Sequence, residues 1–106
     1  MSTERLNKLL IMEQQKPADA FIKFALAQEY ANLNDFNNAL LYYTSLVENF
    51  SAYLPSYYHL GKLYEQLNQP ALAIGIYSKG LELAKKTGDA KTAGEINEAL
   101  MLLEDE

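Results

Sequence analysis

An internal repeat constrains the fold of this chain more than any other feature of its sequence. The segment Leu26-Ala27-x-x-Tyr30 recurs as Leu60-Gly61-x-x-Tyr64, with each residue 34 positions later, a shift that we call the repeat step. The same shift relates four further pairs of similar residues: Leu33 and Leu67, Ala39 and Ala73, Leu40 and Ile74, and Tyr43 and Tyr77. Internal repeats of about 20–50 residues are typical of supersecondary units that stack on one another and share a core. The sequence therefore predicts an array of equivalent units.

The spacing of apolar residues predicts that these units are made of helices. Apolar side chains recur at steps of three and four residues, and no sustained period-2 alternation predicts a strand. Pro17 suits the opening turn of a second helix. Gly88 suits a helix end, and Asp89 suits the N-cap of the next helix. We expect six helices, at about residues 3–16, 17–33, 36–50, 55–68, 70–87 and 89–104.

The repeated residues resemble the tetratricopeptide repeat family, whose unit is an antiparallel pair of helices. The two Leu–Ala/Gly–x–x–Tyr segments match an element on the first helix of that unit. Ala39 with Tyr43, and Ala73 with Tyr77, match an alanine followed four residues later by an aromatic residue on the second helix. The resemblance implies an all-α fold, a right-handed α-α superhelix of two hairpins. Small residues such as Gly61, opposite Ala73, would let the paired helices cross closely.

The resemblance also implies a division of the chain, residues 1–106, which we expect to form a single domain. Residues 20–53 would be the first repeat and residues 54–87 the second. Helices at 3–16 and 89–104 would cap the two ends, because the motif of a third repeat would fall on Gly94, Glu95 and Glu98. Such arrays need end caps with a polar face for solubility.

In this family the first helix of each pair lines a concave groove that binds a partner. The implied groove residues are Phe21, Phe24, Gln28 and Asn32 in the first repeat, and Tyr58, Lys62, Glu65 and Gln66 in the second. These aromatic, charged and amide side chains suit an extended or helical peptide. An alternative for Phe21 and Phe24 is packing beneath the N-terminal helix. A carboxylate clamp of the kind found in one subgroup is not expected, because Phe24 and Gln28 occupy the places of its Lys and Asn.

Composition opposes several other functions. The net charge is −5, and the isoelectric point is about 4.8, which opposes binding to nucleic acid or to an anionic membrane surface. The chain contains no Cys and one His, His59, so neither a metal site nor a cofactor site is expected. No catalytic motif is present, and we expect a protein that is not an enzyme. The absence of cysteine, of a signal peptide and of a long apolar run predicts a cytoplasmic location.

The primary hypothesis is therefore an interaction adaptor or scaffold that binds another protein or peptide. A structural, self-associating protein is the first alternative, because four apolar residues of the end helices lie off the main apolar faces: Ile11, Met12, Met101 and Leu102. RNA binding is a weaker third alternative, since other helical repeats of similar length read RNA bases.

Overall fold

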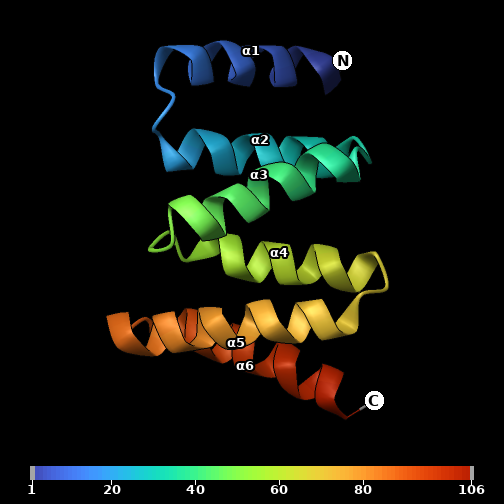
Figure 1. Ribbon diagram of the computed structural model, residues 1–106, viewed down its shortest axis with the longest axis vertical. Helices are drawn as coiled ribbons and strands as arrows, with labels where there is room; N and C mark the ends of the chain where they lie inside the picture. Colours follow the sequence, from blue (N-terminus) through green and yellow to red (C-terminus); the bar gives the residue numbers. More distant parts are fainter. Residues whose placement is uncertain (1, 106) are drawn as a thin grey trace. The chain divides into compact units, whose positions relative to one another are not determined.

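The structure is a computed structural model that describes residues 2–105, and these residues form six helices without a strand (Figure 1). The helices are α1 Ser2–Gln15, α2 Ala20–Asn32, α3 Phe36–Asn49, α4 Pro55–Gln66, α5 Pro70–Thr87 and α6 Ala90–Glu104. The predicted all-α fold is confirmed. The chain divides into two compact units, of which the first ends at Tyr53 and the second begins at Leu54.

The start of α2 differs from the prediction. The helix begins at Ala20, whereas Pro17 lies in the turn that follows α1. Asp19 explains the difference, because its carboxylate accepts a hydrogen bond from the backbone N–H of Ile22 at 3.2 Å. A side chain that satisfies a free N–H of the first turn fixes the helix start at the next residue. The expectation that Pro17 opens this helix was therefore wrong.

In the first unit, α2 and α3 form an antiparallel hairpin, and α1 packs against α2 (Figure 1). Asn34 joins the two hairpin helices in the left-handed conformation, with φ of 61°. The buried residues of this hairpin include Leu26 and Ala27 of α2 and Ala39 and Tyr43 of α3. All four residues belong to the repeated pattern, so the pattern records the buried face of the hairpin.

In the second unit, α4 and α5 form the corresponding hairpin, and α6 packs against α5. Asn68, one repeat step after Asn34, takes the same left-handed conformation, with φ of 60°. The buried residues of this unit include Leu60, Gly61, Ala73 and Tyr77 of the hairpin, and Ile96, Ala99 and Leu100 of α6. Each buried position of the first hairpin named above is thus buried again one repeat step later.

The ring of Tyr77 lies directly against Gly61. The three atoms nearest to the place that a Gly61 side chain would take all belong to this ring, and a Cβ atom there would overlap them. The sequence interpretation placed Ala73 opposite Gly61, and the structure adds the Tyr77 ring as the group nearest to the place of a Gly61 side chain. Glycine is needed at this position because the aromatic ring fills the space of a side chain.

The end of α5 and the start of α6 agree with the sequence analysis. Gly88 takes the left-handed conformation with φ of 77°, which suits a residue without a Cβ. The carboxylate of Asp89 then accepts the backbone N–H of Thr92 at 3.0 Å and the hydroxyl of Thr92 at 2.8 Å. These hydrogen bonds favour the charged carboxylate and hold the pKa of Asp89 below its ordinary value.

Candidate partner-binding surfaces

The four residues predicted on α2 divide into exposed and packed side chains. Phe21 is 64% exposed, and Asn32 is also exposed. Gln28 is half-buried. Phe24 is only 8% exposed, and its ring lies 6.1 Å from the ring of Tyr43 and 5.6 Å from that of Tyr53. Phe24 thus contributes to the packing of the first unit, whereas the other three predicted residues, Phe21, Gln28 and Asn32, are exposed or half-buried.

Three of the four residues predicted on α4 form a connected cluster in the second unit. The Lys62 ammonium lies 5.4 Å from the centre of the Tyr58 ring, within the range of a cation–π contact. The same ammonium lies 3.9 Å from the Glu65 carboxylate. The fourth residue, Gln66, is exposed on the same helix. We call Tyr58, Lys62 and Glu65 the α4 cluster.

Tyr77 of α5 supports the α4 cluster from beneath. Its hydroxyl donates a hydrogen bond to the Glu65 carboxylate, and its ring lies 6.3 Å from that of Tyr58. Burial raises the pKa of the Tyr77 hydroxyl well above its ordinary value, and the hydrogen bond to Glu65 raises it further. Tyr77 therefore remains a protonated donor at physiological pH and fixes the position of the Glu65 carboxylate.

A polar network in the first unit was not predicted from the sequence. Glu13 of α1 accepts hydrogen bonds from the Lys23 ammonium and from the Tyr42 hydroxyl, each at 2.8 Å. Burial first, and the Glu13 hydrogen bond second, raise the pKa of Tyr42 well above its ordinary value. A second ion pair, between Arg5 and the buried Glu29, joins α1 to α2 at 3.3 Å. These contacts tie α1 to the hairpin.

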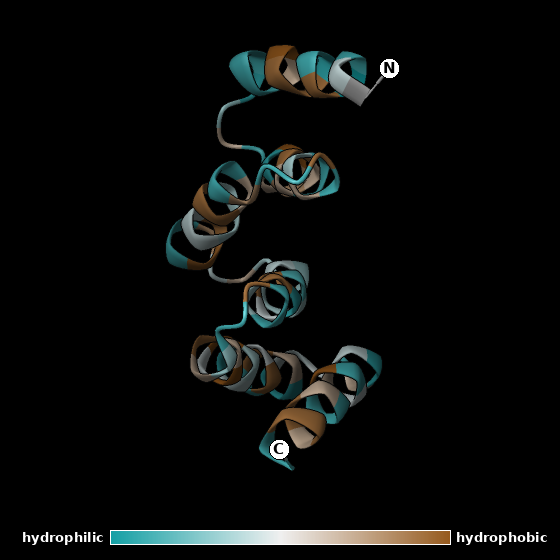
Figure 2. Ribbon diagram, turned by 90° about the vertical axis from the view of Figure 1, so that its right-hand side faces the viewer, coloured by the Kyte–Doolittle hydropathy of each residue, from teal (hydrophilic) through white to brown (hydrophobic). Residues whose placement is uncertain are grey.

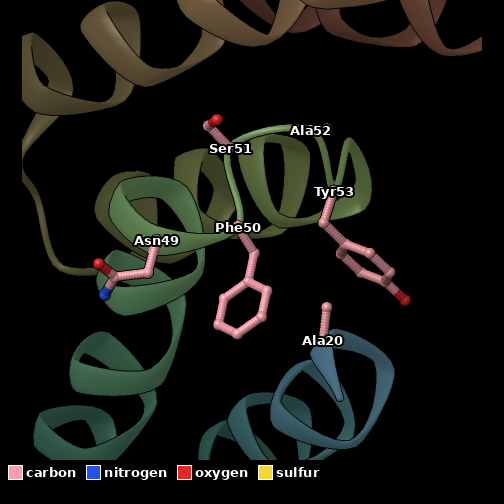
Figure 3. A pocket seen from close by; sticks show the side chains of 6 residues that line it. All are labelled: Ala20, Asn49, Phe50, Ser51, Ala52 and Tyr53. Atoms are coloured by element: carbon pink, nitrogen blue, oxygen red, sulfur yellow. The ribbon is translucent and has the colours of Figure 1, made fainter. Parts of the chain in front are cut away.

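A hollow of about 450 Å³ lies in the first unit where α3 ends and the chain turns. Figure 3 shows the rings of Phe50 and Tyr53 extending from this turn toward Ala20, the first residue of α2. Asn49, Ser51 and Ala52 complete the lining. The sequence analysis missed this feature because the path of an irregular turn, which decides where its two rings point, leaves no periodic pattern.

Two further properties concern the described residues, 2–105. None of their helices combines the length and apolar character that crossing a bilayer requires. Their His, Asp and Glu side chains form no group of three that could hold a metal ion. The cytoplasmic location expected from the sequence stays a prediction.

Comparison with known sequences identifies the family. The sequence profile described as tetratricopeptide repeat matches residues 22–50 and 54–87, together more than half of the chain. The chain belongs to the tetratricopeptide repeat family. The two matched segments contain the two hairpins, α2 with α3 and α4 with α5, apart from the first residues of α2. A comparison with curated proteins found no match.

Solved structures of similar proteins agree with this assignment. The solution NMR structure of a tetratricopeptide repeat domain protein from Salinibacter ruber is 39% identical, with a TM-score of 0.81, over 85% of this chain and 91% of that chain. The crystal structure of a Salinibacter ruber tetratricopeptide repeat domain protein is 39% identical, with a TM-score of 0.78, over 82% and 97% of the respective chains. A Bordetella parapertussis protein is 24% identical, with a TM-score of 0.81, over 94% and 87%, and its likeness shows the fold alone.

Membership of this family carries a general function. Tetratricopeptide repeats generally mediate interactions between proteins, and family members are generally not catalysts.

Proposed function

We propose that this protein is a non-catalytic adaptor that binds a peptide or a helix of another protein on α2 and α4, the first helices of its two hairpins. The α4 cluster carries the proposal. It places one cation in contact with both an aromatic ring and a carboxylate at the surface of the second unit. Tyr77 supports it from the core, so a partner would meet side chains that are already positioned.

The chemistry of the α4 cluster indicates what a partner would contribute. Lys62, with its side chain 47% exposed, would pair with an acidic side chain or a terminal carboxylate. The Tyr58 ring would contact an apolar side chain, and Gln66 would exchange hydrogen bonds with a peptide backbone. Such an arrangement favours a partner segment with alternating acidic and apolar residues.

The first unit would add a separate apolar contact. Phe21 is a large exposed aromatic side chain, and aromatic residues often make the largest contributions at protein interfaces. The hollow lined by Phe50 and Tyr53 lies beside Ala20, the residue that precedes Phe21. An apolar side chain of a partner would fit this hollow, while Gln28 and Asn32 would supply hydrogen bonds.

Quantitative capture of partners from the source cell, with purified variants as bait, tests this proposal. Lys62→Glu and Phe21→Ser are the informative variants, because both side chains are exposed and their replacement leaves the core intact. We expect at least one protein to be captured by the wild type and to be reduced about tenfold with either variant, since loss of an interface anchor costs about 1–2 kcal/mol or more.

Matched controls lie on α5. Lys86→Glu makes the same charge change, and Leu72→Ser removes an exposed apolar side chain, and neither residue belongs to α2 or α4. Captured proteins should be retained by both controls. If Lys62→Glu and Phe21→Ser retain every captured protein as well as the controls do, the partner does not bind on α2 or α4.

A further inference from the structure

The two end helices continue the alternation of first and second helices along the chain. α1 precedes α2, the first helix of the first hairpin, and packs against it. α6 follows α5, the second helix of the second hairpin, and packs against it. By their order in the chain, α1 therefore stands in the place of a second helix and α6 in the place of a first helix.

The face of α1 that corresponds to a hairpin contact is open to solvent. In α3 the buried residues are Ala39, Tyr43 and Leu46. The residues one repeat step earlier, on α1, are Arg5, Leu9 and Met12. The Arg5 side chain, although paired with Glu29, is 74% exposed, Met12 is 44% exposed and Leu9 is half-buried. The adjacent Lys8 is also exposed. This face, defined by Arg5, Lys8, Leu9 and Met12, carries two cations beside two apolar side chains.

The outer face of α6 is open as well. Ile96, Ala99 and Leu100 are buried in the second unit, whereas Met101 and Leu102 are 56% and 62% exposed. Figure 2 shows the hydrophobic colour gathered in the second half of α6, before its hydrophilic end. Glu98 lies one turn before these two residues and is exposed, and Glu104 and Asp105 follow them. This face therefore carries apolar side chains among carboxylates.

The two open faces complement each other in charge and in length. α1 presents Arg5 and Lys8, with the exposed Glu4 one turn before Lys8, while the nearby Glu13 is occupied by Lys23 and Tyr42. The helices have 14 and 15 residues, and an antiparallel alignment would set Lys8, near the middle of α1, opposite Glu98, near the middle of α6. Opposite charges placed across an interface favour one register and one partner.

We propose that α1 of one copy of this protein packs antiparallel against α6 of a second copy, so that the two end helices complete a hairpin between chains. The contact is heterologous, because different surfaces of the two copies meet. Arg5 occupies the position that Ala39 has in α3 and Ala73 has in α5. Because its side chain is larger than that of alanine, α1 and the α6 of the second copy lie farther apart than the paired helices of a hairpin. The contact then depends on charge, and salt weakens it.

Sedimentation velocity of residues 1–106 tests this proposal. The average mass should rise above that of one chain with increasing protein concentration, and the rise should shrink in high salt. Lys8→Glu and Glu98→Lys should each weaken association about tenfold, because each places like charges across the contact. Both residues are exposed, so the variants should keep the wild-type circular dichroism spectrum.

An equimolar mixture of the two variants provides the decisive comparison. In the mixture, the glutamate introduced on α1 of one variant meets the lysine introduced on α6 of the other, so association should return to near the wild-type level. The same swap on α5, with Lys86→Glu and Glu82→Lys, should leave the wild-type mass distribution unchanged in each variant and in their mixture. A mass of one chain at every concentration would overturn the proposal, as would association that neither charge reversal weakens or that the mixture fails to restore.

Discussion

Replacing Gly61 with leucine is expected to lower the free energy of unfolding by about 1–3 kcal/mol or more, because the new side chain would overlap the buried ring of Tyr77. The Tyr77 ring belongs to the core and its hydroxyl donates a hydrogen bond to Glu65, so the ring cannot move aside without loss of packing and of that hydrogen bond. Urea denaturation followed by circular dichroism measures the change. The slope with urea shows whether two-state unfolding is preserved.

Gly75→Ala is the matched control for this substitution. Gly75 also lies in a helix, α5, but it is exposed and no atom lies within 4 Å of the place a side chain would take. Alanine there should raise the free energy of unfolding by about 0.5–1 kcal/mol, because glycine is the weaker helix former. If Gly61→Leu were as stable as the wild type, the assigned contact between Gly61 and Tyr77 would be wrong.

Leu26→Ala and Leu60→Ala should each lower the free energy of unfolding by about 2–5 kcal/mol, the range typical of a large core side chain cut back to alanine. The two leucines are related by the repeat step, and both are 0% exposed. A loss of this size is a large share of the total stability of a domain, about 5–15 kcal/mol. Chemical denaturation of the two variants measures both values under the same conditions.

Leu41→Ala and Leu72→Ala serve as the comparison for these leucines, because both side chains are exposed on their helices. Their effects should stay within about 0.5 kcal/mol. If alanine at Leu26 or Leu60 lowered the free energy of unfolding no more than it does at the exposed leucines, the two core positions would not be equivalent. The repeat would then not describe the core.

The elements that local signals mark were predictable from the sequence. The two hairpins follow from the spacing of residues such as Leu26, Ala39 and Tyr43, because each helix must bury the same face in each copy. The bounds of α5 were predicted correctly, since Pro70 suits a first turn and Gly88 suits the left-handed end. Because the repeat presents each such signal twice, a wrong helix assignment would require the same error at two positions.

Features set by contacts between helices were not predictable in the same way. Pro17 and Asp19 both provide helix-start signals, and only the hydrogen bond from Ile22 shows which of them prevails. The network of Glu13, Lys23 and Tyr42 joins three helices through residues far apart in the sequence. Lys23 is the one basic residue of α2, and it was the signal that could have pointed to the network.

The candidate binding surfaces lie between these two cases. Tyr58 and Lys62 are four residues apart on one helix, so their contact follows from helical spacing. Tyr77 lies on a second helix, so its hydrogen bond to Glu65 could not be predicted from the spacing of residues on α4. Phe24 shows the same limit, since an aromatic side chain on a helix suits a groove or a core equally well in sequence alone, and the rings of Tyr43 and Tyr53 decide for packing.

An experimental structure of the protein would measure the equivalence of the two hairpins, on which the fold and the proposed surfaces both depend. Superposing the backbone of residues 22–50 on that of residues 56–84 should place Leu26 on Leu60, Ala39 on Ala73 and Tyr43 on Tyr77, with each pair buried alike. A best superposition at a different shift, or a pair with one buried and one exposed member, would contradict the equivalence of the two copies.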